Sequence, residues 1–134
     1  MTDQISFSFT RPVSAKAVQS LLRQTDWAGT RTEEDIQVML GNSSLLLGAW
    51  REDSLVGFAR VLTDDCFRAF IDDVVVTEAE RGQGVGHALM DHLMQRLVHL
   101  EEVTLFCDET VVSFYEQHNF ARASGSATMK WRSQ

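Results

Sequence analysis

The 134-residue sequence lacks the features that mark several large classes of protein. It has one proline and no proline-, glycine- or serine-rich linker, so we expect a single domain over residues 1–134. Its longest apolar runs, such as SLLLGAW, are too short to cross a bilayer. Its first residues, MTDQISFSFT, lack the cationic start of a secretory signal. These absences favour a cytoplasmic protein with no membrane partner.

Cysteine is scarce as well, with Cys66 and Cys107 as the only two. They lie far apart in the sequence, and neither a C-x-x-C pair nor an H-x-x-x-H pattern is present. We therefore expect two buried, reduced thiols and predict that the protein has no metal site.

Positive charge is the third scarcity. Lysine and arginine together number 12 against 19 acidic residues, which gives a net charge of -7. Proteins that bind nucleic acid draw affinity from clustered cations that neutralise phosphates, and this sequence has no such cluster. The balance argues against a nucleic-acid partner and is compatible with a cationic one such as an amine.

What the sequence does have is a series of strand and helix patterns. ISFSF alternates apolar and polar residues, as a half-buried strand does, and the run from residue 86 carries apolar residues at helical spacing. The predicted strands are 5–9, 44–50, 55–62, 67–76, 103–107 and 126–131, and the predicted helices are 14–27, 32–41, 86–98 and 111–120. The order β-α-α-β-β-β-α-β-α-β indicates a mixed α/β or α+β fold.

Three glycines, Gly82, Gly84 and Gly86, stand between the fourth strand and the third helix. The dinucleotide pattern G-x-G-x-x-G fails, because its third glycine would fall on His87 or Leu89. The P-loop pattern fails because no lysine occurs between Lys16 and Lys130, so none stands next to the glycines. Two interpretations stay open on spacing alone: a helix start whose free N–H groups bind an anion, and a tight turn that needs positive φ.

Two stretches resemble the GNAT superfamily of N-acetyltransferases. In RGQGVG, Arg81, Gly84 and Gly86 occupy the positions of the family signature R/Q-x-x-G-x-G/A. Downstream, VVSFYEQHNF is similar to the family's late helix, which commonly ends in F-Y-x-x-x-G-F. Asn119 replaces the last glycine, and asparagine is the next residue best suited to a left-handed helix end. The resemblance implies an enzyme that transfers an acetyl group from acetyl-CoA to an amine by direct attack in a ternary complex.

The resemblance also implies where acetyl-CoA, the expected co-substrate, would bind. Its pyrophosphate would contact Arg81 and the loop amides, and its pantetheine arm would pair with the end of the fourth strand like an added strand. Glu78 and Glu80 flank this site, so the amides and Arg81 must offset their charge. The expected cofactor-binding residues are Val74, Val75, Val76, Arg81, Gly82, Gln83, Gly84, Val85, Gly86 and His87.

Acyl transfer to an amine needs a base for the amine and an acid for the leaving thiolate. In the family, the tyrosine of the F-Y motif, here Tyr115, commonly acts as the acid; the alternative is a tyrosine that only packs at a helix edge. Asp72 and Asp73 are the candidate bases, and equally they could be structural. Because adjacent strand residues point to opposite faces, we expect only one to face a given pocket, and we favour Asp72.

The remaining site residues concern the acceptor. In the family, the segment between the first two helices selects the substrate, and here it contains Trp27 and Arg31, which would contact an aromatic group and a carboxylate. Asp108 would orient the amine or cap a helix. We expect a small-molecule primary amine as the acceptor. The alternatives are a lysine or N-terminal amine of a protein or peptide, and a catalytically silent acyl-CoA-binding module. None of the histidines is expected to be catalytic, and a homodimer is a further expectation from the resemblance.

Overall fold

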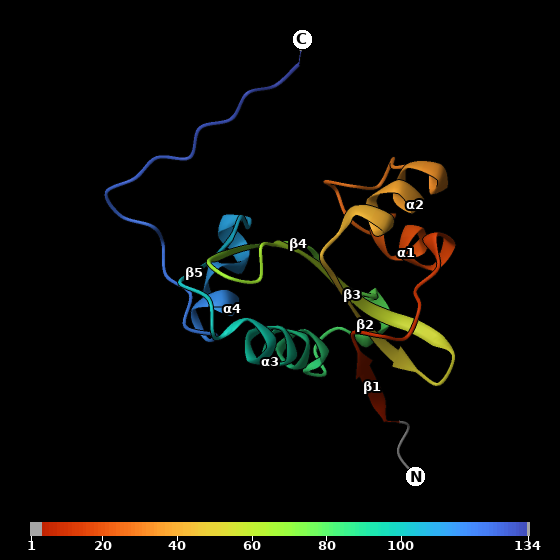
Figure 1. The fold of residues 1–134 in the computed structure, drawn as a ribbon. Helices are drawn as coiled ribbons and strands as arrows, with labels where there is room; N and C mark the ends of the chain where they lie inside the picture. The colour runs from red at the N-terminus through yellow and green to blue at the C-terminus, as the bar shows by residue number, and fades with distance from the viewer. Residues whose placement is uncertain (1–3, 134) are drawn as a thin grey trace.

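In a computed structural model that describes residues 4–133, one five-stranded sheet lies between two groups of helices (Figure 1). The strands lie in the order in which they occur in the chain; β1 to β4 are antiparallel, and β5 is parallel to β4. The strands are β1 (Ile5–Ser8), β2 (Leu45–Arg51), β3 (Ser54–Thr63), β4 (Arg68–Val76) and β5 (Glu102–Leu105). The helices are α1 (Ala15–Leu22), α2 (Glu33–Asn42), α3 (Val85–Leu97) and α4 (Val112–Glu116). The predicted mixed α/β fold is confirmed.

Each face of the sheet is covered by its own hydrophobic cluster. Helices α1 and α2 pack with Phe58 and Val75 on one face. On the other face α3 packs against the sheet, and its Leu89, Met90 and Leu93 are fully buried. Helical spacing in the predicted helix 86–98 favoured such a buried stripe, but Val98, the last residue of that prediction, lies beyond the end of α3 and is 78% exposed.

The alternation expected along β4 is interrupted by a bulge. Between the paired residues Arg60–Asp72 and Phe58–Val75, β4 contains one residue more than β3. Asp73 takes up this extra length with a φ of 55°, a left-handed conformation that aspartate tolerates better than most residues. Because of the bulge, Asp72 and Asp73 both bind the side chain of Arg60. The expectation that these two acids point to opposite faces is therefore wrong.

The two parallel strands β4 and β5 pair over only part of their length. Their ladder ends at Ile71 and Leu105, whereas β4 continues to Val76. No described strand pairs with residues 72–76 on the side facing β5. This stretch of β4 therefore has an edge at which another extended segment can bond.

The sixth predicted strand, 126–131, does not form. Residues 121–133 contain no helix or strand, and they extend away from the sheet (Figure 1). Met129 and Trp131 are 87% and 86% exposed, so the alternating pattern is not matched by any surface that would bury it. A strand pattern is realised only when a neighbouring strand and a packing face are available, and this segment has neither here.

Two further expectations can be checked against the fold. Cys66 and Cys107 are both exposed, so the expectation of two buried thiols is wrong; each lies in a loop beyond a strand end. Within residues 4–133, no helix is long and apolar enough to span a membrane. Because one copy of the chain is described, the expected homodimer stays a prediction, as does the extent of the domain.

Candidate cofactor and acceptor sites

The glycine loop that links β4 to α3 has the backbone of an anion-binding helix start. Gly82 and Gly84 have φ values of 79° and 86°, and Gly84 is the N-cap of α3. The first hydrogen bond of the helix runs from Ala88 N to Gly84 O at 3.0 Å, so the N–H groups of residues 85–87 precede it. The glycines thus permit the positive φ of a tight turn, and the N–H groups of residues 85–87 have no acceptor within the helix. That these groups bind an anion stays a prediction.

A cavity of about 350 Å³ lies over these amides. It is lined by Val76, Glu80, Arg81, Gly82, Gly84, Val85, Gly86, His87 and Phe114. A Cβ added to Gly82 or Gly84 would meet nothing within 4 Å, so these glycines leave the cavity mouth open. A Cβ on Gly86 would lie 3.4 Å from the ring of Phe114, so this glycine lets α4 approach α3 closely. Seven of the ten residues expected to bind the cofactor line this cavity.

The remaining three expected residues lie just outside the cavity. Val74 and Val75 precede Val76 on β4, at the edge that no described strand occupies on the β5 side, and Gln83 lies between two lining glycines. A ligand with a diphosphate at the α3 N-terminus and an extended arm along β4 would fit this arrangement, because the free amides and the strand edge are continuous through Val76.

The acidic flank of the cavity is neutralised by a residue that the sequence did not single out. Arg51, at the end of β2, binds the Glu80 carboxylate through Nε at 2.8 Å and through a terminal nitrogen at 2.9 Å. These hydrogen bonds lower the pKa of Glu80, with a smaller opposing effect of burial. Arg81 donates from Nε to the Val76 carbonyl at 3.1 Å, which leaves its terminal nitrogens for a ligand. The cavity is thus less negative than the sequence indicates.

Tyr115 lies on α4, next to a residue that lines the cavity. Its ring packs edge-on against Phe114 with centroids 4.9 Å apart, and against Phe120. Burial, together with the nearby Cys107, raises the pKa of Tyr115 to about 12, so the phenol is protonated at neutral pH. The hydroxyl makes no hydrogen bond to a described residue and is not sealed from solvent.

Helix α4 ends at Glu116, four residues before the predicted end, but the left-handed turn expected at Asn119 is present. Asn119 has a φ of 68°, the left-handed conformation that the glycine of the family motif would adopt. The N–H groups of His118 and Phe120 both bond the Tyr115 carbonyl, at 2.9 and 3.2 Å. This tight turn fixes the end of α4 directly behind the tyrosine.

On the α1–α2 face, the two candidate acceptor residues meet one of the two candidate bases. The Asp73 carboxylate accepts from Arg60 Nε at 2.6 Å, from Arg31 at 2.9 Å and from Trp27 Nε1 at 3.2 Å. Asp73 is 3% exposed, and Trp27 is 57% exposed. The loop between α1 and α2 is therefore tied to the bulge of β4 by two donors, Trp27 and Arg31, on a carboxylate that also binds Arg60 of β3.

The two acids differ in how far their charge is already satisfied. Burial on its own would raise the pKa of Asp73, but the hydrogen bonds and charges of Arg60 and Arg31 outweigh it, and the pKa is lowered. Asp72 keeps about a third of its side chain exposed, and it accepts from Arg60 at 2.9 Å and from the Asp73 N–H. Asp73 thus has the properties of a structural anion, whereas Asp72 remains open to a ligand. An arginine within an apolar strand, as in FARVL, is the signal that could have predicted the Arg60 contacts.

The third candidate acceptor residue is placed elsewhere. Asp108 follows β5, and its Oδ1 accepts from the Thr110 N–H at 2.9 Å and from the Thr110 hydroxyl at 2.8 Å. These bonds lower its pKa. This is the capping role that was the alternative for this residue, and the structure does not bring Asp108 together with Trp27, Arg31 or Asp73.

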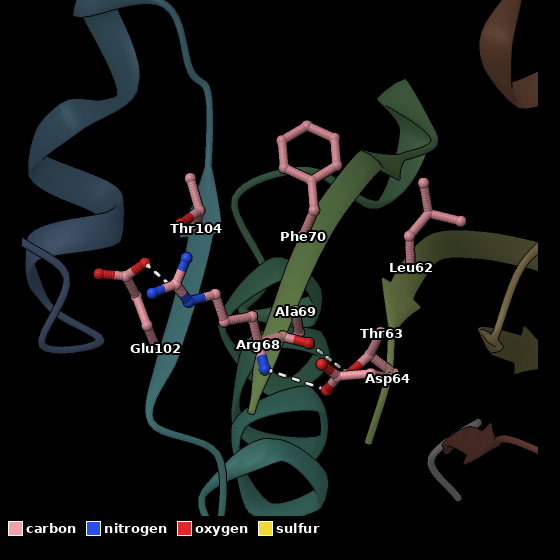
Figure 2. A pocket seen from close by; sticks show the side chains of 8 residues that line it. All are labelled: Leu62, Thr63, Asp64, Arg68, Ala69, Phe70, Glu102 and Thr104. Carbon is pink, nitrogen blue, oxygen red and sulfur yellow. Dashed lines mark hydrogen bonds and ion pairs between the residues drawn. The ribbon is translucent and has the colours of Figure 1, made fainter. Parts of the chain in front are cut away.

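A second cavity, of about 460 Å³, lies at the opposite end of β4 and shares no residue with the first (Figure 2). Its Asp64 carboxylate accepts from three backbone N–H groups, those of residues 66–68, and Arg68 faces Glu102 at 3.9 Å across it. None of the expected site residues lines it. Among residues 4–133 there is also no cluster of side chains suited to hold a metal ion.

Together, the splayed sheet and the glycine turn define an α/β protein with a cavity at the N-terminus of α3, beside the edge of β4. Comparison with known proteins identifies the family. Residues 12–120 match the model of the Acetyltransferase (GNAT) family, so the chain belongs to this family and is an N-acetyltransferase. Members of the family use acetyl-CoA.

Individual relatives agree with this assignment. The chain is 32% identical over 126 residues to an uncharacterized N-acetyltransferase, ycf52-like, from Prochlorococcus marinus, covering 88% of this chain and 69% of that protein. It is 31% identical over 143 residues to the histone acetyltransferase TAP1 of Glycine max, covering 96% of this chain and 62% of that protein. The crystal structure of a putative GNAT-family acetyltransferase from Xanthomonas campestris superposes with a TM-score of 0.85 at 26% identity, covering 96% and 94% of the two chains.

Proposed function

We propose that the protein transfers the acetyl group of acetyl-CoA to the primary amine of a small molecule, by direct attack within a ternary complex. The observation that carries this proposal is the continuity of two binding features. The free amides at the start of α3 lie next to the unpaired edge of β4, and Val76 belongs to both. A diphosphate followed by an extended amide-containing arm is the ligand chemistry that such a surface recognises.

In this proposal each part of the cavity has its own role in binding. The N–H groups of residues 85–87 and the terminal nitrogens of Arg81 bind the diphosphate, and Arg51 keeps Glu80 from repelling it. The edge of Val74–Val76 bonds the arm and thereby orients the thioester toward the acceptor. Acetyl-CoA, when bound, supplies a carbonyl carbon that an amine attacks, with a thiolate as leaving group.

The proton transfers can be assigned to two side chains. An alkyl amine with a pKa near 10.4 must lose a proton before it attacks, which costs about 4–5 kcal/mol at neutral pH. Asp72 is the better candidate to accept this proton, directly or through water, because Asp73 is already bound by two arginines. Tyr115 is the candidate acid for the leaving thiolate.

The high pKa of Tyr115 limits how this acid can act. Transfer from a phenol with a pKa of about 12 to a thiolate whose conjugate acid has a pKa near 8.5 is uphill by roughly 5 kcal/mol. Proton donation by Tyr115 must therefore be coupled to the breaking of the C–S bond, or the hydroxyl must act as a hydrogen-bond donor to the sulfur.

The exposed face of Trp27 supports a small acceptor with an aromatic or cationic group. Its indole N–H is fixed on Asp73, which holds the ring in place while more than half of its surface remains open. A flat, preorganised aromatic surface can stack on a ring or bind an ammonium group. Arg31 contributes positive charge beside it, although one of its nitrogens is already bound to Asp73.

A protein acceptor is the second candidate, because the relative from Glycine max is named a histone acetyltransferase. The two candidates are separated by measuring CoA release with a panel of aromatic amines, alkyl amines, amino acids, and lysine-containing peptides. Turnover with small amines, at concentrations at which the peptides give no turnover, supports the proposal. Turnover confined to the peptides contradicts it. Binding of acetyl-CoA without turnover on any acceptor would indicate a silent module.

The role of Tyr115 is tested with the variant Tyr115→Phe, which keeps the ring and removes only the hydroxyl. We expect kcat to fall by about 10²-fold or more, with little change in the affinity for acetyl-CoA. Ser113→Ala, on the exposed side of the same helix, is the matched control and should leave both values unchanged. Equal losses of turnover and affinity in Tyr115→Phe would show that the tyrosine is structural.

A further inference from the structure

Two histidines outside the acid–base assignment form a chain of polar contacts that ends at the cofactor cavity. His87 Nδ1 lies 2.9 Å from His118 Nε2, and His118 Nδ1 lies 3.4 Å from a carboxylate oxygen of Asp91. His87 is the third residue of α3 and lines the cavity, whereas His118 lies two residues beyond the end of α4. The chain therefore connects the exposed Asp91 to the cavity through a histidine whose side chain is only 9% exposed.

The outer nitrogen of His87 is available to a ligand. The ring is held on one side by His118 and packs against Phe114 with centroids 4.6 Å apart. Its Nε2 has no hydrogen-bond partner among the described residues. Every buried side-chain nitrogen of these residues does have a partner, so Nε2 is not a buried atom. Nε2 is thus accessible from solvent, on a residue that shares the cavity with Arg81 and the free amides.

The positions of the hydrogens follow from the acceptor at the far end of the chain. We assign the hydrogen of neutral His118 to Nδ1, because this atom lies 3.4 Å from the Asp91 carboxylate. When both rings are neutral, His118 Nε2 is then an acceptor, His87 Nδ1 donates to it, and His87 Nε2 presents a lone pair. A lone pair at this atom repels a phosphate oxygen. One additional proton turns Nε2 into an N–H donor and gives the cavity a positive charge.

We propose that His87, supported by His118 and Asp91, is a phosphate-binding side chain that takes up a proton when a diphosphate enters the cavity. This inference rests on the proposed binding of acetyl-CoA and concerns how its anionic part is held. The bound anion stabilises the protonated ring, and Asp91 stabilises the same charge through His118 from the opposite side.

The charged surroundings of His87 allow such a proton. In the loop before α3, the positive charge of Arg81 disfavours an additional proton on His87, and the charge of Glu80 is neutralised by Arg51. From α3 itself, Asp91 favours it, and from α4 the neighbouring Tyr115 is neutral at the pH of interest. The strand residue that lines the cavity, Val76, carries no charge. The incoming diphosphate is thus the largest new charge that the ring meets.

The test is calorimetric titration with 3′-dephospho-CoA, in two buffers of the same pH that differ in ionisation enthalpy. This ligand keeps the diphosphate and lacks the phosphate monoester, which would itself exchange protons near neutral pH. At pH 7 the wild-type protein should take up roughly half a proton on binding. Its affinity should accordingly fall roughly tenfold between pH 6 and pH 8.

Two substitutions of the same residue make the result specific. His87→Gln should bind without proton uptake, and its affinity should not change over this pH range. His87→Arg carries a permanent charge, so it should retain tight binding at pH 8, again without uptake. His99→Gln, beyond the far end of α3, is the matched control and should behave like the wild type.

The outcomes separate this inference from the proposed function. Binding by the wild type without proton uptake would overturn the role of His87 and leave acetyl-CoA binding intact. Undiminished uptake in His87→Gln would overturn it as well. Absence of binding in the wild type, with acetyl-CoA and with 3′-dephospho-CoA, would overturn the proposed function and the inference together.

Discussion

Replacing Asp73 with asparagine should destabilise the protein strongly. Asp73 is 3% exposed, and its carboxylate accepts three hydrogen bonds, two of them from arginines. An amide offers one oxygen in place of two and would direct N–H groups at a guanidinium. Removing one partner of a buried ion pair costs about 3–5 kcal/mol. Asparagine tolerates positive φ as aspartate does, so the bulge itself is not strained by the change.

The measurement is urea unfolding of the wild type, Asp73→Asn and Asp72→Asn. With an m-value of about 1.5 kcal/mol/M, a loss of about 3 kcal/mol lowers the midpoint by about 2 M. Asp72 is partly exposed and leaves Arg60 paired with Asp73, so Asp72→Asn should cost only about 1 kcal/mol or less. An unchanged midpoint in Asp73→Asn, combined with lost turnover, would refute the structural role and mark Asp73 as the base.

Three further outcomes follow from the fold and the loop. Gly84→Ala should lower the free energy of unfolding by about 1–2 kcal/mol and weaken acetyl-CoA binding, because φ is 86° here and alanine is strained at this φ even though its Cβ has room. The control Gly41→Ala, in the exposed last turn of α2, should instead raise the free energy of unfolding by about 0.5–1 kcal/mol, as measured by thermal unfolding. Arg51→Gln should weaken acetyl-CoA binding several-fold at low salt, since Glu80 is left unneutralised, and adding Glu80→Gln should restore it; no recovery would contradict the assigned role. The folded-state pKa of Asp73 is lowered, so its stabilisation is complete above about pH 4 and is lost as pH falls further; unfolding midpoints measured from pH 6 to pH 3 should therefore drop less steeply in Asp73→Asn than in the wild type.

The parts of the site that the sequence predicted are those with local causes. Gly82 and Gly84 adopt positive φ, and so does Asn119 after α4. Residue type alone largely decides which residues can adopt this left-handed conformation. The start of α3 and its buried stripe follow from helical spacing in the same way. For this reason a cavity lies over the glycine loop, in which the motif occurs, and the binding of acetyl-CoA there stays a prediction.

The parts that were missed depend on distant residues. The bulge at Asp73 arises from the register between β3 and β4, which no local pattern specifies, and it reverses the expected direction of one acid. Arg51 reaches Glu80 across 29 positions of the chain, and His87 meets His118 across 31. The strand expected at 126–131 fails for the converse reason, because its pattern is present but no partner strand is.

The most direct test of the central claim is to follow the backbone amide resonances of the labelled protein during titration with acetyl-CoA. The claim is that the diphosphate is held by the N–H groups at the start of α3 and the arm by the edge of β4. The largest shifts should therefore occur at residues 82–87 and 74–76. Shifts centred instead on Thr63 and Thr104, at the cavity of Figure 2, would contradict the claim, as would saturation without any change in the glycine loop.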